Sequence, residues 1–233
     1  LSEATARLDH AYEIYGSNPS LGFFGWDERL GAGFENPNLE ENQNSYKLLS
    51  IQAWKDFAAV LTGIGQTGLA QKYAGYADEK TAELTADPEF YKAYGLHASA
   101  DAINAGVGDV DTLYHADFGD RLNRISYSPF NEYMLLQAMA RAGKYDDAIS
   151  AVLDLWGGQI KYGGTMFFET FRPGWNEIIG QNDPVPNNQA GYTSLAHPWS
   201  DGVLSWLNEE ILGIKAETAG FSSFTVKPHL GRQ

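Results

Sequence analysis

The stretch of sequence that decides the fold is SPFNEYMLLQAMARAGKYDDAISAVLDLWGG, which runs from Ser128 to Gly158. Apolar residues recur every three or four positions on both sides of Gly143, a spacing typical of two amphipathic helices. Ser128 and Pro129 indicate a helix start, with Ser as the N-cap and Pro in the first turn. The spacing predicts helices over 130–142 and 145–156. The stretch therefore predicts an αα-hairpin.

The same helical spacing recurs over most of the chain. Further helices are expected over 1–15, 45–63, 66–84, 91–105, 109–118 and 193–212, and one strand is expected at the C-terminus. Helices in successive hairpins can build either a superhelical repeat array or a closed toroid. Long segments rich in Gly, Pro and Asn at 16–44 and 174–191 favour the toroid, with its loops gathered at one end around a cleft. The sequence therefore predicts an all-α fold.

Composition and charge exclude several classes of function. The 233 residues carry a formal net charge of −14, and 43% of them are hydrophobic, which is typical of a globular domain. We expect neither nucleic acid nor a membrane as a partner, because binding to phosphates or to anionic lipids needs clustered Lys and Arg. The chain has no cysteine, which excludes disulfides and thiolate metal sites. Without a metal-ligand spacing or a phosphate-binding motif, no metal or other cofactor is expected.

One carboxylate stands inside an apolar and aromatic run. Glu169 lies in GGTMFFETF, residues 163–171, close to Phe168 and Phe171. A charged residue is rarely placed among aromatic side chains unless it has a partner or a task. Burial in such a place raises the pKa of a carboxyl, which suits an acid or base that works near neutral pH. The alternative is a structural anchor bonded to the backbone or to Arg172, and the residues alone leave both interpretations open.

Three blocks around Glu169 carry a resemblance to a known family. They are GGTMFFETF at 163–171, SLAHPWSDGVLSWLNEEILGI at 194–214 and GFSSFTVKP at 220–228. In this order they resemble the C-terminal part of the α-L-rhamnosidases, glycoside hydrolase family 78, and the hairpin at 128–158 is similar to the helix pair that precedes them there. The resemblance covers the last half of the chain well and the first half loosely. Phe168 and Phe171 stand where the family has Trp, and Pro198 after the His is a further departure, which concerns the substrate preference.

The resemblance implies an (α/α)6 barrel, the fold of the six-hairpin glycosidases. About eight helices are too few for six hairpins, so residues 1–219 are expected to form part of a toroidal catalytic domain. Residues 220–233 are expected to begin a C-terminal β-domain that is truncated here. Because the first residue is Leu1 rather than Met, we expect the chain to be a piece of a larger polypeptide. The remainder of that polypeptide or a second chain would complete the barrel, and an extracellular or periplasmic location is favoured.

For activity, the resemblance implies inverting hydrolysis of terminal α-L-rhamnosyl or related residues, with Glu169 as the general base that activates water. Inverting enzymes also need a carboxylic acid about 6.5–9.5 Å from the base. In the family this acid lies in a block like D-x-P-x-R-D-E-R-x-G-W, of which Asp27-Glu28-Arg29-Leu30-Gly31 is an echo. We favour another interpretation, in which Trp26 and Asp27 match a later aromatic block that lines the sugar pocket. The acid would then be missing and the isolated chain nearly inactive, while Glu28 stays the alternative acid.

Three further residues are candidates for the sugar site. His197 matches a family histidine that hydrogen-bonds the sugar, although a lone His is more often a core residue. Trp175, in the loop after Glu169, could stack on a sugar face or simply anchor the loop. Tyr127 precedes a helix start of the kind that faces the cleft in such toroids. The alternative to an enzyme is a helical-repeat module that binds carbohydrate or protein without turnover.

Overall fold

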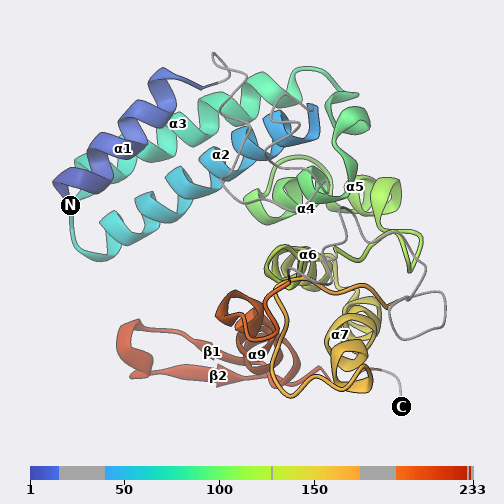
Figure 1. Ribbon diagram of the computed structural model, residues 1–233. Helices are drawn as coiled ribbons and strands as arrows, with labels where there is room; N and C mark the ends of the chain where they lie inside the picture. Colours follow the sequence, from blue (N-terminus) through green and yellow to red (C-terminus); the bar gives the residue numbers. More distant parts are fainter. Residues whose placement is uncertain (16–39, 127, 174–192, 230, 232–233) are drawn as a thin grey trace. The chain divides into compact units, whose positions relative to one another are not determined.

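The computed structural model describes residues 1–15, 40–126, 128–173, 193–229 and 231. Over these residues the chain is mostly helical, with a two-stranded sheet near the C-terminus (Figure 1), in agreement with the predicted all-α class. It divides into two compact units, Leu1–Asp117 and Phe118–Gln233. The predicted domain boundary at residue 219 stays a prediction. None of the described helices is long and apolar enough to cross a membrane.

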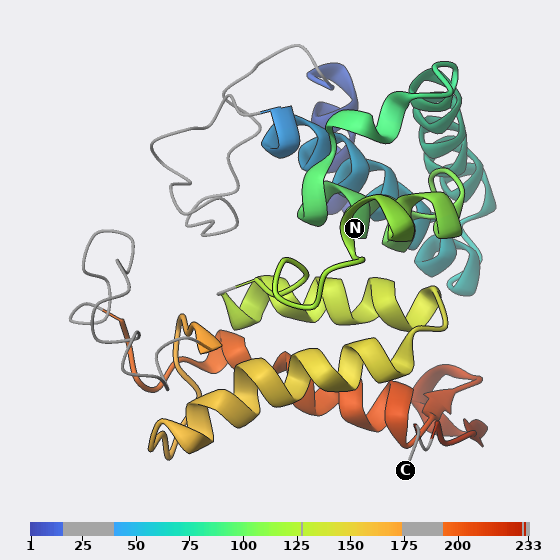
Figure 2. The same cartoon turned by 90° about the vertical axis from the view of Figure 1, so that its right-hand side faces the viewer.

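The first unit is a helical assembly around α2. It contains α1 (Ser2–Glu13), α2 (Glu40–Gly63), α3 (Thr67–Thr85), a short turn η2 (Phe90–Ala93), α4 (Gly95–Ala105) and α5 (Val110–Asp117). The first three helices lie side by side (Figures 1 and 2). The apolar stripe of α2 is buried as its spacing indicates, and Trp54 from this stripe donates its indole N–H to the backbone oxygen of Leu8 in α1 at 3.1 Å.

The start of α4 differs from the prediction, which had one helix over 91–105. The helix begins at Gly95, whose φ is +70°, and a Cβ at this position would lie 2.8 Å from the Glu41 carboxyl carbon. Glu41 Oε1 accepts the backbone N–H of His97 at 2.8 Å and lies 3.4 Å from its Nδ1. Burial raises the pKa of the Glu41 carboxyl, but the bonds and charge of His97 outweigh it, and the net pKa is lowered. Glu41 lies in α2, which begins at Glu40 rather than at the predicted Ser45.

The second unit is a layer of helices with the sheet at its end. It contains α6 (Pro129–Arg141), α7 (Tyr145–Lys161), a 3-10 turn η5 (Pro198–Asp201), α9 (Gly202–Trp206), a π turn η6 (Leu207–Ile211), β1 (Ile214–Ala216), η7 (Ala219–Phe221) and β2 (Phe224–Val226). The helix α6 contacts both α7 and α9, which lie alongside it (Figure 2). The expected C-terminal strand is present as β2. It pairs antiparallel with β1, which the sequence did not predict, in the register Ile214 to Val226.

The hairpin of α6 and α7 forms as its sequence predicts. Gly143 has φ +70° and donates its N–H to Ala140 at 2.9 Å, while Lys144 donates to Met139 at 2.8 Å. These two bonds satisfy carbonyl groups at the end of α6 in a Schellman motif, which needs a residue with positive φ. At the other end Ser128 takes the N-cap position, but its side chain makes no capping bond. The prediction of Ser128 at the N-cap and Pro129 in the first turn is therefore confirmed.

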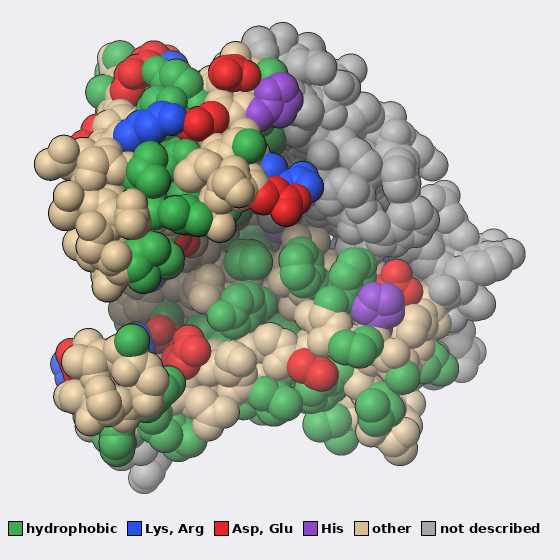
Figure 3. Space-filling view, turned by 90° about the vertical axis from the view of Figure 1, so that its left-hand side faces the viewer, with side chains coloured by type: hydrophobic (Ala, Val, Ile, Leu, Met, Phe, Trp, Pro, Cys, Tyr) green, Lys and Arg blue, Asp and Glu red, His purple; other side chains and the backbone are tan. Residues whose placement is uncertain are grey.

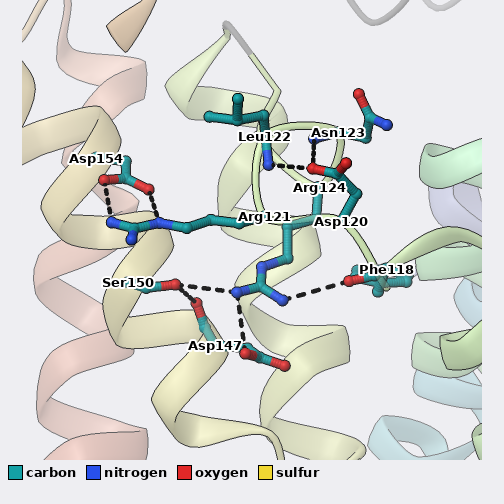
Figure 4. A network of polar contacts seen from close by, with 9 residues as sticks. All are labelled: Phe118, Asp120, Arg121, Leu122, Asn123, Arg124, Asp147, Ser150 and Asp154. Atoms are coloured by element: carbon teal, nitrogen blue, oxygen red, sulfur yellow. Dashed lines mark hydrogen bonds and ion pairs between the residues drawn. The ribbon is translucent and has the colours of Figure 1, made fainter.

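Two arginines fix the segment before α6 against α7 (Figure 4). Arg121 forms two bonds with Asp154, at 2.7 and 2.8 Å. Arg124 contacts Asp147 at 2.9 Å and the hydroxyl of Ser150 at 3.1 Å. The Arg121 side chain is 59% exposed and that of Arg124 only 9%, so solvent screens the first pair far more than the second. We therefore assign most of the anchoring to Arg124.

The last predicted helix, 193–212, begins later than expected. His197 is extended, with φ −122° and ψ 106°, and the first helical turn starts at Pro198. Proline disfavours the helical region for the residue before it, which accounts for this boundary. Residues 193–197 are consequently free to pair with another part of the chain.

Candidate functional site

The candidate site is built on two short irregular segments of the second unit. One follows α7 and carries Glu169, and the other precedes η5 and carries His197. The backbone N–H of Glu169 donates to Ser194 at 2.8 Å, and that of His197 donates to Phe167 at 2.9 Å. The segments therefore run antiparallel and are joined by backbone bonds, although 25 residues separate Glu169 from its partner Ser194.

Phe168 is the residue that locks the first segment into the unit. Its backbone N–H donates to the Gln159 Oε1 atom at 2.8 Å, and its backbone oxygen accepts from the Ser200 hydroxyl at 2.6 Å. Ser200 is held in turn by the indole N–H of Trp156, at 2.9 Å from its backbone oxygen. These partner residues are all nearly or fully buried, where an unmade hydrogen bond is costly. The backbone next to Glu169 is therefore fixed by α7 and η5.

The carboxylate of Glu169 lies at the edge of this frame. Its Oε2 accepts the backbone N–H of Ser194 at 3.0 Å and lies 3.9 Å from His197 Nδ1. The side chains of Glu169 and His197 are 18% and 30% exposed. A carboxylate held by the N–H of Ser194 and still reached by solvent can accept a proton from water, and the neighbouring imidazole can hydrogen-bond a ligand.

Two phenylalanines of the Glu169 segment are buried. Phe168 is 5% and Phe171 0% exposed, and both contact the ring of Tyr162 edge-on. Met166, by contrast, is 61% exposed. The aromatic run predicted from the sequence thus packs into the core, whereas Glu169 itself lies between the core and solvent.

The structure brings together two of the predicted site residues, Glu169 and His197. Part of the structural alternative is also observed, because the Glu169 carboxylate is bonded to backbone at Ser194. His197 is not a fully buried core histidine, since its side chain keeps 30% of its exposure. The other predicted residues lie outside the described part of the chain: they are Trp26, Asp27, Tyr127 and Trp175, together with the alternative acid Glu28.

Sequence reasoning missed three residues that shape the site. Ser194 supplies the N–H that holds the carboxylate. Trp199 donates its indole N–H to the backbone oxygen of Glu169 at 3.2 Å. Phe130 stacks on Trp199, with ring centroids 5.5 Å apart. Trp199 stands two positions after His197, so the two rings could have been expected near each other, whereas nothing in the sequence links them to Phe130.

A second carboxyl of this unit, Glu132 in α6, is sealed from solvent. It is 0% exposed, and its Oε2 accepts the backbone N–H of Ser126 at 2.6 Å. Burial raises the pKa of Glu132 well above its ordinary value, although this N–H and the charge of Arg124 oppose the rise. A group without solvent contact cannot reach a substrate, so we regard Glu132 as a structural carboxyl.

The described residues also line a polar cavity away from Glu169. A cavity of about 760 Å³ opens at the N-terminus of α7, whereas Glu169 follows the C-terminus of that helix; its lining includes Tyr145, Asp146 and His229. Over the described part of the chain, no group of three or more His, Cys, Asp or Glu residues could hold a metal ion.

Comparison with known proteins adds no relative. The chain matches no protein-family model and no curated protein. The resemblance to a family therefore rests on the sequence blocks quoted above alone.

Proposed function

We propose that the chain is part of a glycoside hydrolase that resembles the inverting α-L-rhamnosidases, with Glu169 as the general base. The observation that carries the proposal is the pairing of the Glu169 and His197 segments. The sequence blocks that resemble the family contain these two residues, and their side chains lie 3.9 Å apart at a solvent-exposed edge. A partial (α/α)6 toroid, with terminal α-L-rhamnosyl or related residues as substrate, belongs to the same proposal.

The proposed role of Glu169 is to remove a proton from water as that water attacks the sugar. One carboxylate oxygen is held by Ser194, which fixes the direction of the carboxylate and leaves it able to accept a proton. His197 hydrogen-bonds a hydroxyl of the bound sugar. In the proposal, the partner acid that protonates the leaving oxygen in such enzymes is supplied by another part of the protein.

The missing acid determines which substrate tests the proposal. A natural glycoside has a poor leaving group and needs the acid, whereas 2,4-dinitrophenyl α-L-rhamnoside releases a stable phenolate without protonation. This substrate therefore reports on the base alone. We expect the full chain to hydrolyse it, and Glu169→Gln to lower kcat by about 10²–10⁴-fold with little change in KM, because glutamine keeps the shape but cannot accept a proton.

Glu209→Gln is the matched control, since Glu209 is an exposed carboxylate of the π turn η6 in the same unit. It should leave kcat unchanged. Added azide should restore turnover of Glu169→Gln by replacing the activated water, with the inverted glycosyl azide as product. If Glu169→Gln instead keeps its kcat and melts well below the unsubstituted chain, Glu169 is a structural anchor. Sugar binding without any turnover would favour the non-catalytic binding module.

A further inference from the structure

Three rings form a continuous layer beside the candidate base. Phe130, from the first turn of α6, stacks on Trp199 with centroids 5.5 Å apart and planes inclined by 28°. On Trp199 lies His197, with centroids 4.4 Å apart and planes inclined by 56°. We call these three residues the ring wall. It joins two parts of the chain that are about 70 residues apart in the sequence.

The ring wall is bonded to the backbone that carries Glu169 and lies close to the Glu169 carboxylate. Trp199 holds the backbone oxygen of Glu169 at 3.2 Å, and His197 Nδ1 lies 3.9 Å from Oε2. Ser200, directly after Trp199, is fully buried and bonded to Phe168. The wall and the carboxylate therefore keep one geometry, which is what a binding site next to a catalytic group requires.

The outer end of the ring wall is open to solvent. Phe130 is 41% exposed although one of its faces is covered by Trp199. Exposed hydrophobic side chains occur elsewhere on the molecule (Figure 3), so this exposure alone would carry no argument. Here, however, two more lie on the paired segments themselves: Met166 is 61% and Leu195 58% exposed. An exposed phenylalanine that continues a layer of rings with an imidazole, next to a carboxylate, suits a ligand with one apolar face and polar edges.

A pyranose ring has this character, because its C–H groups form an apolar face that packs on aromatic rings while its hydroxyls lie at the edge. We propose that the ring wall binds a pyranose, with the C–H face of the sugar packed on Phe130. This pyranose is one of the two sugar rings joined by the bond that is cleaved. This inference rests on the proposed function and goes beyond it by assigning Phe130 and Trp199 to substrate binding.

The test measures sugar affinity and turnover separately in the full chain. Binding of methyl α-L-rhamnoside is followed by saturation-transfer NMR and calorimetry, and turnover with the dinitrophenyl rhamnoside. We expect Phe130→Ala and Phe130→Leu to weaken binding by about two- to tenfold, the range for loss of one aromatic contact. Phe130→Tyr keeps the ring face and should restore binding. Phe221→Ala is the matched control, because Phe221 is a comparably exposed phenylalanine, 56%, of the same unit, and it should bind as the unsubstituted chain does.

The outcomes separate this inference from the proposed function. Binding that depends on Phe130 without any turnover would support the ring wall and overturn the hydrolase. Turnover that Glu169→Gln abolishes, with KM and sugar affinity unchanged in Phe130→Ala, would support the hydrolase and overturn the ring wall. A chain that neither binds nor hydrolyses the rhamnosides overturns both. Equal weakening by Phe130→Ala and Phe221→Ala would also overturn the assignment, because the effect would then not be local.

Discussion

Gln159 gives the sharpest test of how the site is held. This residue of α7 is fully buried, and its Oε1 accepts the backbone N–H of Phe168 at 2.8 Å, directly before Glu169 in the chain. Its Nε2, in contrast, is buried without a hydrogen-bond partner. Replacing Gln159 with Leu keeps the apolar volume approximately, leaves the Phe168 N–H without an acceptor and removes the unpartnered Nε2.

These two effects oppose each other in the global stability but not at Phe168. An unsatisfied buried N–H costs about 1–3 kcal/mol, and loss of the unpartnered Nε2 returns a similar amount, so the net change in unfolding free energy should lie within about 0–2 kcal/mol. The N–H of Phe168 itself should lose its full protection. A cost of about 1–3 kcal/mol corresponds to about 5- to 150-fold faster hydrogen exchange at this one amide.

Native-state hydrogen exchange followed by NMR is therefore the assay. It also avoids assigning one unfolding free energy to a chain with two compact units, for which two-state behaviour cannot be assumed. Gln137→Leu is the matched control, because Gln137 of α6 bonds the hydroxyl of Tyr133 instead, and it should leave the Phe168 amide as protected as before. If Gln159→Leu leaves this exchange rate unchanged, the segment is held by other contacts and the anchoring described for Glu169 is wrong.

Three further predictions concern charge and packing. The pKa of Glu132 is raised in the fold, so Glu132 binds its proton more tightly in the folded state than in the unfolded state. Its contribution to the unfolding free energy therefore falls as pH rises above about 4.3. Glu132→Gln should remove this fall, which urea titrations at several pH values would measure. The pKa of Glu41 is lowered, so its pairing with His97 stabilises above the unfolded-state pKa and is lost as pH falls through the folded-state pKa. Glu41→Gln should lower the midpoint of thermal unfolding at neutral pH, followed by circular dichroism. The fall of this midpoint with decreasing pH should be smaller than in the unsubstituted chain. Trp199→Phe keeps an aromatic ring but loses the N–H to the Glu169 backbone, which should cost about 1 kcal/mol in thermal unfolding and lower kcat for the dinitrophenyl rhamnoside.

The elements that the sequence predicted well are those whose causes are local. The apolar stripe of α2, from Leu48 to Leu61, is buried because its spacing matches one helical face. The hairpin of α6 and α7 closes at Gly143, whose positive φ a glycine adopts at no steric cost. In both cases the pattern within a few turns determines the structure.

The elements that were predicted wrongly or missed depend on partners far along the chain. At the break before α4, Gly95 has positive φ, and the carboxyl of Glu41 from another helix occupies the space where its side chain would stand. The strand β1 is three residues long and forms by pairing with β2, so its own residues carry too short a pattern to be recognised. The helix over 193–212 was predicted from helical spacing. This spacing gives no sign that residues 194 and 197 pair with the Glu169 segment. Pro198 was the one local signal of the correct boundary.

The candidate site shows the same division. Composition placed Glu169 among aromatic residues and indicated that it would be buried with them. In the structure, Phe168 is 5% exposed and packs inward, whereas the Glu169 side chain is 18% exposed. The run MFFETF therefore has two functions at once: its phenylalanines bind the segment to the core, and its carboxylate is presented at the edge by the same backbone. The partner His197 reaches this edge because its backbone is extended rather than helical and its N–H pairs with Phe167. Whatever ligand the site takes, its geometry thus depends on a backbone pairing between two segments that no local pattern in either of them could reveal.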